Sequence, residues 1–596
     1  MISAAALHRY LHVLDASDAP RLLAAALRGG RAGRPSNVHD AGLYLLGGLI
    51  ATDVEGQATI AAIVRALMTQ LARSEQRELG IPLDEEGQRT FTARLYAINK
   101  KITHKLNYGD WLTREPAPTE PKHKPIDADE VTRRRDQLQT FIDAVLGATV
   151  LDMEQGSFAL DASGIHSWGR YSGPARLGEE IERDDEEPDP DHQGPAPDVA
   201  AVNEAAEVAQ AEPNPAEQRR RRGKRDDSYD PEAATGGKTN KRGRNERFYG
   251  YHLHALTRVC ETRNGIRQSP LAIQSFTVTP ANADVVAPSL MLLDNTMAAG
   301  TRITKLAVDR HYSFKRWDRW RRELRIRGIK PTHDLRSTDH GFSDYDGMKL
   351  AAGWPHCPAT PDHLARIERP GFAATREDWR DFAARIEERR AYAMRRVNDH
   401  DANGRTRWQC PALAGSCGCT LREGTVAAVQ QATREATDRG DRILIPIVTT
   451  GAAHQPDGAR LRPCSQTTVS IPDGDHMKMY QEHYWGSPEW EADWNLRTFV
   501  EAWFGVAKNP TVAGMDRHFY RGIGTAHVSL AVLFAAVVTN IHLLRTWHAE
   551  TELGPADHPL LHPDEDNHGF ERLDAGRAAH VDRAHALRAL TAPEAA

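Results

Sequence analysis

The chain has 596 residues, of which 40% are hydrophobic, so it can form roughly three or four domains and at least one sizeable core. Its net charge of −6, from 76 Lys plus Arg and 82 Asp plus Glu, favours no class of partner. The local balance differs, because residues 179–191 hold nine acids and one arginine whereas residues 310–330 hold nine bases and two acids. A basic block of this kind can face a polyanion.

Secreted and membrane proteins are the first classes that the sequence excludes. The start, MISAAALHRYLHVLD, lacks the basic-then-apolar profile of a signal peptide. The longest apolar stretch, 528–541, has 14 residues where a membrane span needs ~20, so we expect a buried helix there and no membrane association. Six cysteines in 596 residues do not make a disulfide framework. We therefore expect a reduced, cytoplasmic protein.

The N-terminal part of the chain has the apolar spacing of helices. Ala/Leu-rich stretches recur over residues 1–112, and a Pro/Lys-rich linker follows at 116–125. We expect an all-helical domain over 1–125 and a further helix over about 128–148.

The rest of the chain alternates between strand and helix patterns. The expected strands are 157–162, 249–259, 271–279, 305–309 and 329–335, and the expected helices are 282–297, 314–327 and 490–509. Residues 178–240 have few large apolar side chains, so we expect a disordered or extended insertion. This order fits an α/β fold of the ribonuclease-H-like kind, a mixed sheet flanked by helices. Its expected parts are 150–336, a Cys-containing insertion at 337–488, last helices at 489–548 and a tail at 549–596.

Three carboxylates stand at informative places in this order. Asp161 ends the first expected strand, Asp309 ends the fourth, and Glu501 lies in the last helix. The first and fourth strands are neighbours in a ribonuclease-H-like sheet, so these side chains could converge. Shared hard oxygen ligands are what a pair of Mg²⁺ ions needs for in-line phosphoryl displacement.

The last helix has a polar stripe. At 100° per residue, Trp494, Arg497 and Lys508 lie within about 40° of Glu501. The apolar residues on the far side, at roughly 140° to 220°, are Leu496, Phe499, Trp503 and Val506. An acid flanked by two cations and an aromatic ring suits a metal ligand bordered by phosphate-binding groups. An Arg–Glu pair at i, i+4 is also common on solvated helices, and strand-end Asp residues often cap turns.

These features occur together in a known family. The segment WNLRTFVEAWFGVAKN resembles the Tyr-x2-Arg-x3-Glu-x6-Lys signature of bacterial DDE transposases of the insertion-sequence class, with Trp494 at the Tyr position. ALDASGIHSW and LAVDRHYS resemble the motifs of the two Asp residues, and FYGYHLHALTRV with TVTPANADVV resembles the middle strands. GRPSNVHDAGLYLLGGLI resembles the helical DNA-binding segment that precedes the catalytic domain.

The resemblance implies a function and a set of partners. Asp161, Asp309 and Glu501 would hold two Mg²⁺ ions, or Mn²⁺ in their place, and water would nick DNA at the transposon end. The freed 3′-hydroxyl would then attack a second phosphodiester. Arg497 and Lys508 would hold phosphates, and Trp494 or Trp485 would stack on a flipped base. The partners would be double-stranded DNA, as terminal repeats and target, and a second copy of the chain in a nucleoid-associated dimer on paired ends.

Cysteines and arginines suggest two further sites. Five of the six cysteines lie in the expected insertion, and Cys357, Cys410, Cys419 and Cys464 are candidate ligands of a structural Zn²⁺. The spacing around Cys417 is not that of paired C-x2-C knuckles, so small buried thiols are the other reading. In the basic helix after Asp309, Arg319 and Arg322 are candidate DNA contacts.

Other functions remain open at this stage. The chain could be a transposase-derived DNA-binding protein that no longer cuts, or a metal-dependent nuclease that cuts without joining strands. It could also be a protein of another kind whose acids form surface ion pairs, which would show no dependence on divalent metal.

Overall fold

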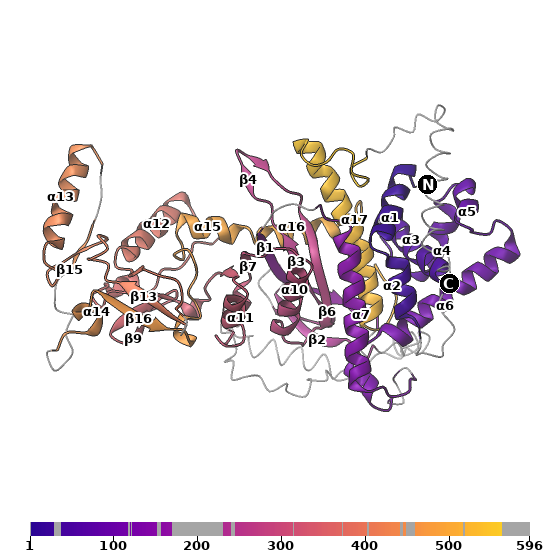
Figure 1. Cartoon of the computed structure of the whole chain (residues 1–596), viewed down its shortest axis with the longest axis horizontal. Coiled ribbons are helices and arrows are strands. Elements are labelled where there is room, and N and C mark those ends of the chain that lie inside the picture. The colour runs from indigo at the N-terminus through magenta and orange to yellow at the C-terminus, as the bar shows by residue number, and fades with distance from the viewer. Residues whose placement is uncertain are drawn as a thin grey trace, which may run out of the picture. The chain divides into compact units, whose positions relative to one another are not determined.

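The chain forms two compact units with mixed α/β structure (Figure 1). Unit 1 comprises Met1–Arg302 and Thr498–Ala596, and unit 2 comprises Ile303–Arg497. The computed structural model describes residues 2–28, 37–116, 120, 122–151, 156–169, 230–239, 245–313, 315–371, 373–401, 404–441, 445–448, 459–516 and 519–562. The expected insertion, 337–488, lies wholly within unit 2.

Unit 1 begins with a helical region, as the apolar spacing predicts. Its helices are α1 (Ala4–Ala16), α2 (Ala19–Ala26), α3 (Val38–Glu55), α4 (Ile60–Thr69), α5 (Arg73–Glu78), α6 (Glu85–Leu106), the 3-10 helix η1 (Asp110–Thr113) and α7 (Ala128–Gly147). Polar side chains begin most of the longer ones: Ser3, Asn37, Thr59, Asp84 and Asp127 each accept a hydrogen bond from a backbone N–H of the first turn. Such caps satisfy donors that a helix start leaves unpaired.

An antiparallel sheet in unit 1 is built around one long strand, β3 (Asn245–Arg258). β1 (Ser157–His166) pairs with one edge of β3, and β2 (Ala234–Thr239) and β6 (Ala272–Pro280) pair with the other. The short strands β4 (Thr262–Arg263) and β5 (Ile266–Arg267) close a hairpin at Asn264 and Gly265, whose positive φ angles of 51° and 79° suit a tight turn. Helix α10 (Val286–Ala298) packs on β6 and β3.

Two predictions for this sheet are wrong. The first strand does not end at Asp161 but runs on to His166, because β3 supplies a backbone partner for every residue from Phe158 to His166. The segment 178–240 is not irregular to its end, since Ala234–Thr239 forms β2. The rest of that segment, 178–229 and residue 240, lies outside the described residues.

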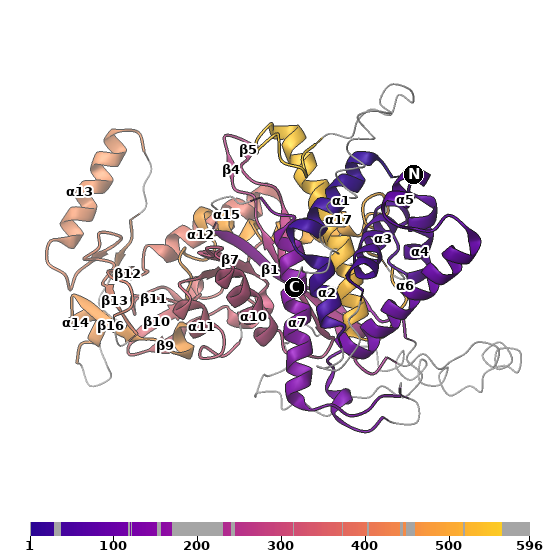
Figure 2. The same cartoon turned by 45° about the vertical axis from the view of Figure 1, so that its right-hand side comes forward.

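A long apolar helix, α17 (Thr525–Thr551), forms the centre of unit 1. It packs on α3, α6, α7 and β6. Figure 2 shows it next to the N-terminal helices. It is long and apolar enough to cross a membrane, yet 89% of its most apolar window is buried inside the protein. The prediction of a buried helix over 528–541 is therefore confirmed.

One polar residue near the middle of α17 connects this helix to β6, to the helix that contains Trp503 and to the turn after α7. The Oδ1 atom of Asn540 accepts hydrogen bonds from the backbone N–H of Ile273 and from Nε1 of Trp503, each at 3.0 Å. Its Nδ2 atom donates to the carbonyl of Ile273 and to Oγ1 of Thr149, each at 2.9 Å. Asn540 is fully buried, so these bonds avoid the cost of an unpaired polar group in the core.

Two buried acids hold the N-terminus of α17. Asp230 accepts from the backbone N–H of Gly524 at 3.1 Å, and Glu232 accepts from that of Thr525. Glu232 also accepts from Nε1 of Trp111 at 3.0 Å, so the acids connect the N-terminal helices to the sheet and to α17. Carboxylates at a helix N-terminus are stabilised by the unpaired N–H groups and the helix dipole. Burial nevertheless raises the pKa of Asp230 to about 6, against hydrogen bonds from Ser167 and Tyr251 that lower it.

Unit 2 is made of short elements. They are β7 (Lys305–Val308), η3 (Arg310–Tyr312), α11 (Arg321–Ile326), β8 (Lys330–Thr332), η4 (Ser337–Asp339), β9 (Ser343–Tyr345), β10 (Met348–Ala351), β11 (Trp354–His356), η5 (Asp362–Leu364), α12 (Arg376–Arg390), β12 (Arg395–Arg396), β13 (Arg405–Gln409), β14 (Gly418–Cys419), α13 (Thr425–Asp438), β15 (Ile447–Val448), α14 (Arg462–Ser465), β16 (Thr468–Pro472), η7 (Asp475–Met477) and α15 (Pro488–Asn495). β7 and β8 pair in parallel. Three-stranded sheets form in the orders β11-β10-β9 and β12-β13-β16.

The core of unit 2 contains many aromatic rings and the buried cation Arg389. Arg389 is 1% exposed, and its Nε donates to the hydroxyl of Tyr484 at 2.8 Å. The guanidinium also lies 5.7 Å from the ring centre of Trp485, a cation–π arrangement. Because the strands here have two to five residues, side-chain packing rather than the strand ladders has to supply most of the stability.

Replacing Gly48 with alanine should destabilise unit 1. A Cβ at Gly48 would stand 2.3 Å from the ring of Phe534, so α3 and α17 would have to separate. We expect a loss of roughly 1–3 kcal/mol in the free energy of unfolding, measured by urea denaturation. Gly147→Ala is the control, because nothing lies within 4 Å of a Cβ there. Equal stability of the two variants would contradict this packing.

Replacing Asp230 with asparagine should change the pH dependence of stability. The folded pKa of about 6 exceeds the ordinary value of 3.8, so the folded state keeps a proton that the unfolded chain has lost. This group therefore makes the free energy of unfolding fall as pH rises from about 4 to about 6, by up to about 3 kcal/mol. Asparagine does not titrate, so the fall should be absent in Asp230→Asn. Parallel curves for wild type and variant, by denaturation at several pH values, would contradict the assignment.

Candidate catalytic carboxylates

Asp161 lies in the middle of β1, opposite Ala255 of β3. Residues Ser157 to Leu160 are buried, whereas Asp161 and the three residues after it are half-buried. Its Oδ1 accepts a hydrogen bond from the backbone N–H of Ala162 at 2.8 Å. The change from buried to half-buried residues places Asp161 where the strand leaves the core, so its carboxylate is accessible although the strand continues.

Glu501 lies in the first turn of α16 (Thr498–Ala507) and is exposed. The single helix expected over 490–509 is two helices, because α15 ends at Asn495 and α16 begins at Thr498. The buried residues of α16 are Val500, Trp503, Phe504 and Ala507. Their mean direction is about 110° from Glu501, so the acid borders the packed face and does not lie opposite it. Of the apolar set expected on the far side, Trp503 alone is fully buried, and Leu496, Phe499 and Val506 are half-buried.

A contact relates α16 to the strand of Asp161. Helix α16 packs on β1 and β3, and Nζ of Lys508 lies 3.4 Å from Oγ of Ser163. Glu501 and Lys508 are seven residues apart and share one helix stripe, and Asp161 and Ser163 share one face of β1. The stripe that carries Glu501 therefore lies over the face of β1 that carries Asp161. Unit 1 thus brings two of the three predicted carboxylates to one side of its sheet.

Asp309 directly follows β7, as the sequence predicts for the end of this strand. It begins η3 and accepts from the backbone N–H of Arg310 at 2.7 Å. Asp309 is half-buried. Asp309 belongs to unit 2, and its convergence with Asp161 and Glu501 stays a prediction.

The two tryptophans proposed to stack on a base are core residues of unit 2. Trp494 is 8% exposed, and its ring stacks on that of Trp490 with the ring centres 5.8 Å apart. The guanidinium of Arg497 lies 5.0 Å from the same ring. Trp485 is fully buried and donates from Nε1 to Asp334 at 2.9 Å. Neither ring offers an open face for a base in this structure, and base stacking by them stays a prediction.

The basic helix expected over 314–327 is shorter than predicted. Helix α11 covers Arg321–Ile326, after a run of turns. Arg319 and Arg322 are exposed, as a DNA contact requires. Arg321 instead buries its guanidinium, which donates to the carbonyl of Tyr480, and burial lowers its pKa to about 10.

In the described part of the chain, no group of three or more His, Cys, Asp or Glu side chains is arranged so that it could hold a metal ion. The donor chemistry at Asp161 and Glu501 nevertheless fits Mg²⁺, since both offer carboxylate oxygens at an accessible border of the sheet. All six cysteines are free thiols, and five of them line one small cavity in unit 2.

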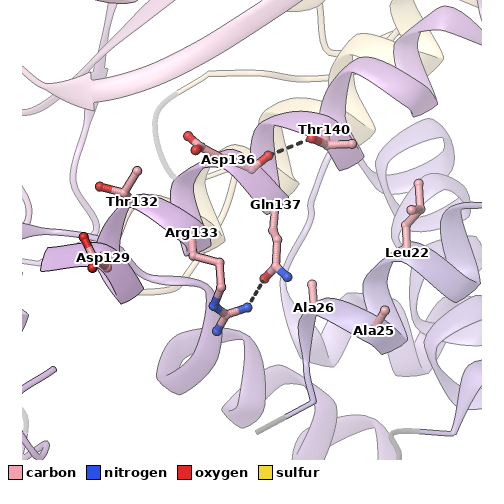
Figure 3. Close-up of a pocket in the computed structure, with 9 residues that line it drawn as sticks. All are labelled: Leu22, Ala25, Ala26, Asp129, Thr132, Arg133, Asp136, Gln137 and Thr140. Atoms are coloured by element: carbon pink, nitrogen blue, oxygen red, sulfur yellow. Dashed lines mark hydrogen bonds between the residues drawn. The ribbon is translucent and has the colours of Figure 1, made fainter. Parts of the chain in front are cut away.

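Two grooves elsewhere add no catalytic group. One of them, in unit 1, has a volume of about 520 Å³. Figure 3 shows Leu22, Ala25 and Ala26 of α2 on one side of it and the polar side chains of α7 on the other. Those polar groups bond along their own helix, as when Arg133 donates to Gln137 at 2.8 Å. A groove of about 710 Å³ in unit 2 contains Arg390, Arg395 and Arg396. Each of the three arginines already has a partner: Glu387, Gln409 and Asp399 respectively.

Sequence reasoning missed the buried acids Asp230 and Glu232 and the buried amide of Asn540. The two acids directly follow a low-complexity run of charged residues and Pro, so nothing in the local sequence distinguishes them from that run. Asn540 interrupts an apolar stretch, and this was the one available signal that a polar contact lies in the core.

No family model matches the chain, and comparison with curated proteins and with solved structures finds no match either.

Replacing Trp494 with alanine should destabilise unit 2 and not act on DNA binding alone. The buried ring packs on Trp490, so its loss should cost roughly 3–5 kcal/mol in the free energy of unfolding. Trp168→Ala is the control, because that ring is 36% exposed. A Trp494→Ala protein that is as stable as wild type but binds DNA more weakly would support base stacking by Trp494.

Proposed function

We propose that this protein is a DNA transposase of the DDE type, with a ribonuclease-H-like catalytic sheet. Asp161, Asp309 and Glu501 are its catalytic carboxylates in this proposal. The observation that carries it is the packing of α16 on β1, with Glu501 on the stripe whose Lys508 reaches Ser163, two residues from Asp161. This packing supports a shared site, because it keeps the helix of Glu501 against the strand of Asp161.

The proposed metal is Mg²⁺, or Mn²⁺ in its place, held by the three carboxylates. When bound, such ions lower the pKa of the attacking water and stabilise charge on the leaving oxygen of the phosphodiester. The protein's part is to hold its carboxylates on rigid elements. Asp161 is fixed by the ladder between β1 and β3, and Glu501 by the core contacts of α16. Rigid placement matters because small displacements of catalytic groups cost much of the rate.

Exposed cations supply the proposed contacts to DNA. Lys508 lies beside the Asp161 face of β1, and its ammonium can bind a phosphate next to the scissile bond. Arg319 and Arg322 are exposed in unit 2 and can bind phosphates further along the duplex. Arg497 is half-buried against Trp494, so it can bind a phosphate only from its exposed edge. The proposed partners are terminal-repeat and target DNA, with two copies of the chain on paired ends.

Cleavage of a labelled duplex that carries the sequence flanking the gene tests the proposal. Wild type should cut with Mg²⁺ and not with EDTA. Glu501→Gln should still bind but cut more than about 100-fold more slowly, since even outer contacts of a metal site are worth 10–100-fold. Glu86→Gln is the matched control, an exposed acid in the first turn of another helix of unit 1, and should cut like wild type.

Other outcomes select the alternatives. A wild type that binds this duplex and never cuts with Mg²⁺ or Mn²⁺ is a DNA-binding protein derived from a transposase. Cleavage without joining of the freed 3′-end to target DNA indicates a nuclease. Equal cleavage by Glu501→Gln and wild type would overturn the catalytic assignment.

A further inference from the structure

Five cysteines from four separate segments of unit 2 meet at one cavity. Its lining includes the side chains of Cys357, Cys410, Cys417, Cys419 and Cys464. These residues span more than 100 positions of the chain, and the sixth cysteine, Cys260, belongs to unit 1. All are free thiols, so no disulfide explains the gathering.

Local backbone structure presents each thiol at the end of a short element. Cys357 follows β11 and Cys410 follows β13, and a proline comes directly after each. Cys419 closes β14, where its backbone N–H and carbonyl both bond to Oγ1 of Thr425 at 3.0 Å. Cys464 lies in the short helix α14, with its N–H donating to the carbonyl of Leu461 at 2.9 Å. A site for one metal ion needs ligands that the backbone holds in place, and these four segments hold their cysteines in that way.

The cavity has the size of a single ion. Its volume is about 20 Å³, slightly above the 10–15 Å³ or so that one water molecule occupies on the same measure. It is lined mainly by sulfur and apolar carbon. Such a wall gives a water molecule few hydrogen bonds, whereas thiolate sulfur is a preferred ligand of Zn²⁺.

A cation already stands at the cavity. Arg422 lines it and donates from Nη2 to the carbonyls of Pro463 at 3.3 Å and of Gln466. The guanidinium therefore joins the segments of Cys419 and Cys464. Four thiolates around Zn²⁺ carry a net charge of −2, and a neighbouring arginine would offset part of it.

One cysteine from each of the four segments gives four ligands, the number that a structural Zn²⁺ takes. Cys417 shares its segment with Cys419 and is 0% exposed, so it is the thiol left to pack in the core beside the site.

We propose that Cys357, Cys410, Cys419 and Cys464 bind one structural Zn²⁺ that holds unit 2 together, with Cys417 packed beside it. The sulfurs as they stand do not form a closed ligand group within the described chain. Closure requires the four sulfurs to turn toward one point of the cavity that they line. Each ligating thiol passes its proton to solvent when the ion binds.

A buried cluster of neutral thiols is the competing explanation, because cysteine is also a good small core residue. The two explanations differ in metal content. The zinc site predicts one metal ion per chain whether or not the protein cuts DNA, so its test is independent of the proposed transposase activity.

The test is metal analysis of the full-length protein, expressed with added zinc and purified under reducing conditions. We expect about one zinc per chain by mass spectrometry. Replacement by Co²⁺ should produce intense thiolate-to-cobalt charge-transfer absorption and the visible bands of a tetrahedral ion. Wild type alone decides the existence of the site, so poorly folding variants do not prevent an answer.

Variants then decide the ligands. Cys410→Ser, Cys419→Ser, Cys357→Ser and Cys464→Ser should each lower bound zinc or abolish the cobalt bands. Cys260→Ser, in unit 1, and Cys417→Ser should keep both. Wild type with less than about 0.1 zinc per chain and no cobalt bands would overturn the site. Loss of zinc from Cys417→Ser, with retention in one of the other four, would overturn the choice of ligands.

Discussion

The burial of α17 is the constraint on which unit 1 depends. A helix this apolar has to be covered on all sides, and α3, α6, α7 and β6 provide the cover. Its polar groups then need partners inside the protein, because water is excluded. Asp230 and Glu232 satisfy N–H groups at its start, and Asn540 satisfies the neighbouring backbone and Trp503 near its middle. The bonds to Gly524, Thr525 and Ile273 join segments that lie more than 250 residues apart in the chain.

The candidate catalytic residues gain their positions from this core. Trp503 bonds to Asn540 from the buried face of α16, which sets the rotation of that helix on β1 and β3. With this rotation fixed, Glu501 lies at the border between helix and strand, and Lys508 reaches Ser163. The helical stripe drawn from the sequence puts Glu501 opposite the packed face of the helix, where its carboxylate would point away from the sheet. In the structure the stripe with Glu501 and Lys508 instead adjoins the packed face of α16.

Unit 2 is stabilised by different contacts from those of unit 1. It has no long buried helix in the part that the structure describes, and its strands are short. Aromatic rings around Arg389 form one part of its core, and the five thiols form another. A bound Zn²⁺ would cross-link segments that lack regular structure, which is how small loop-rich domains commonly offset a limited hydrophobic core.

The sequence by itself determined the helical N-terminal region, the strands around Asp161 and Asp309 and the buried helix near residues 528–541, because apolar periodicity is a local property. It also selected the acids and the cysteines by residue type and order. Only the tertiary structure decided that β1 continues past Asp161, that one expected helix is α15 and α16, and that Trp494 is a core residue. The physical reason is that strand length, helix rotation and burial depend on partners distant in the chain, which no local pattern contains.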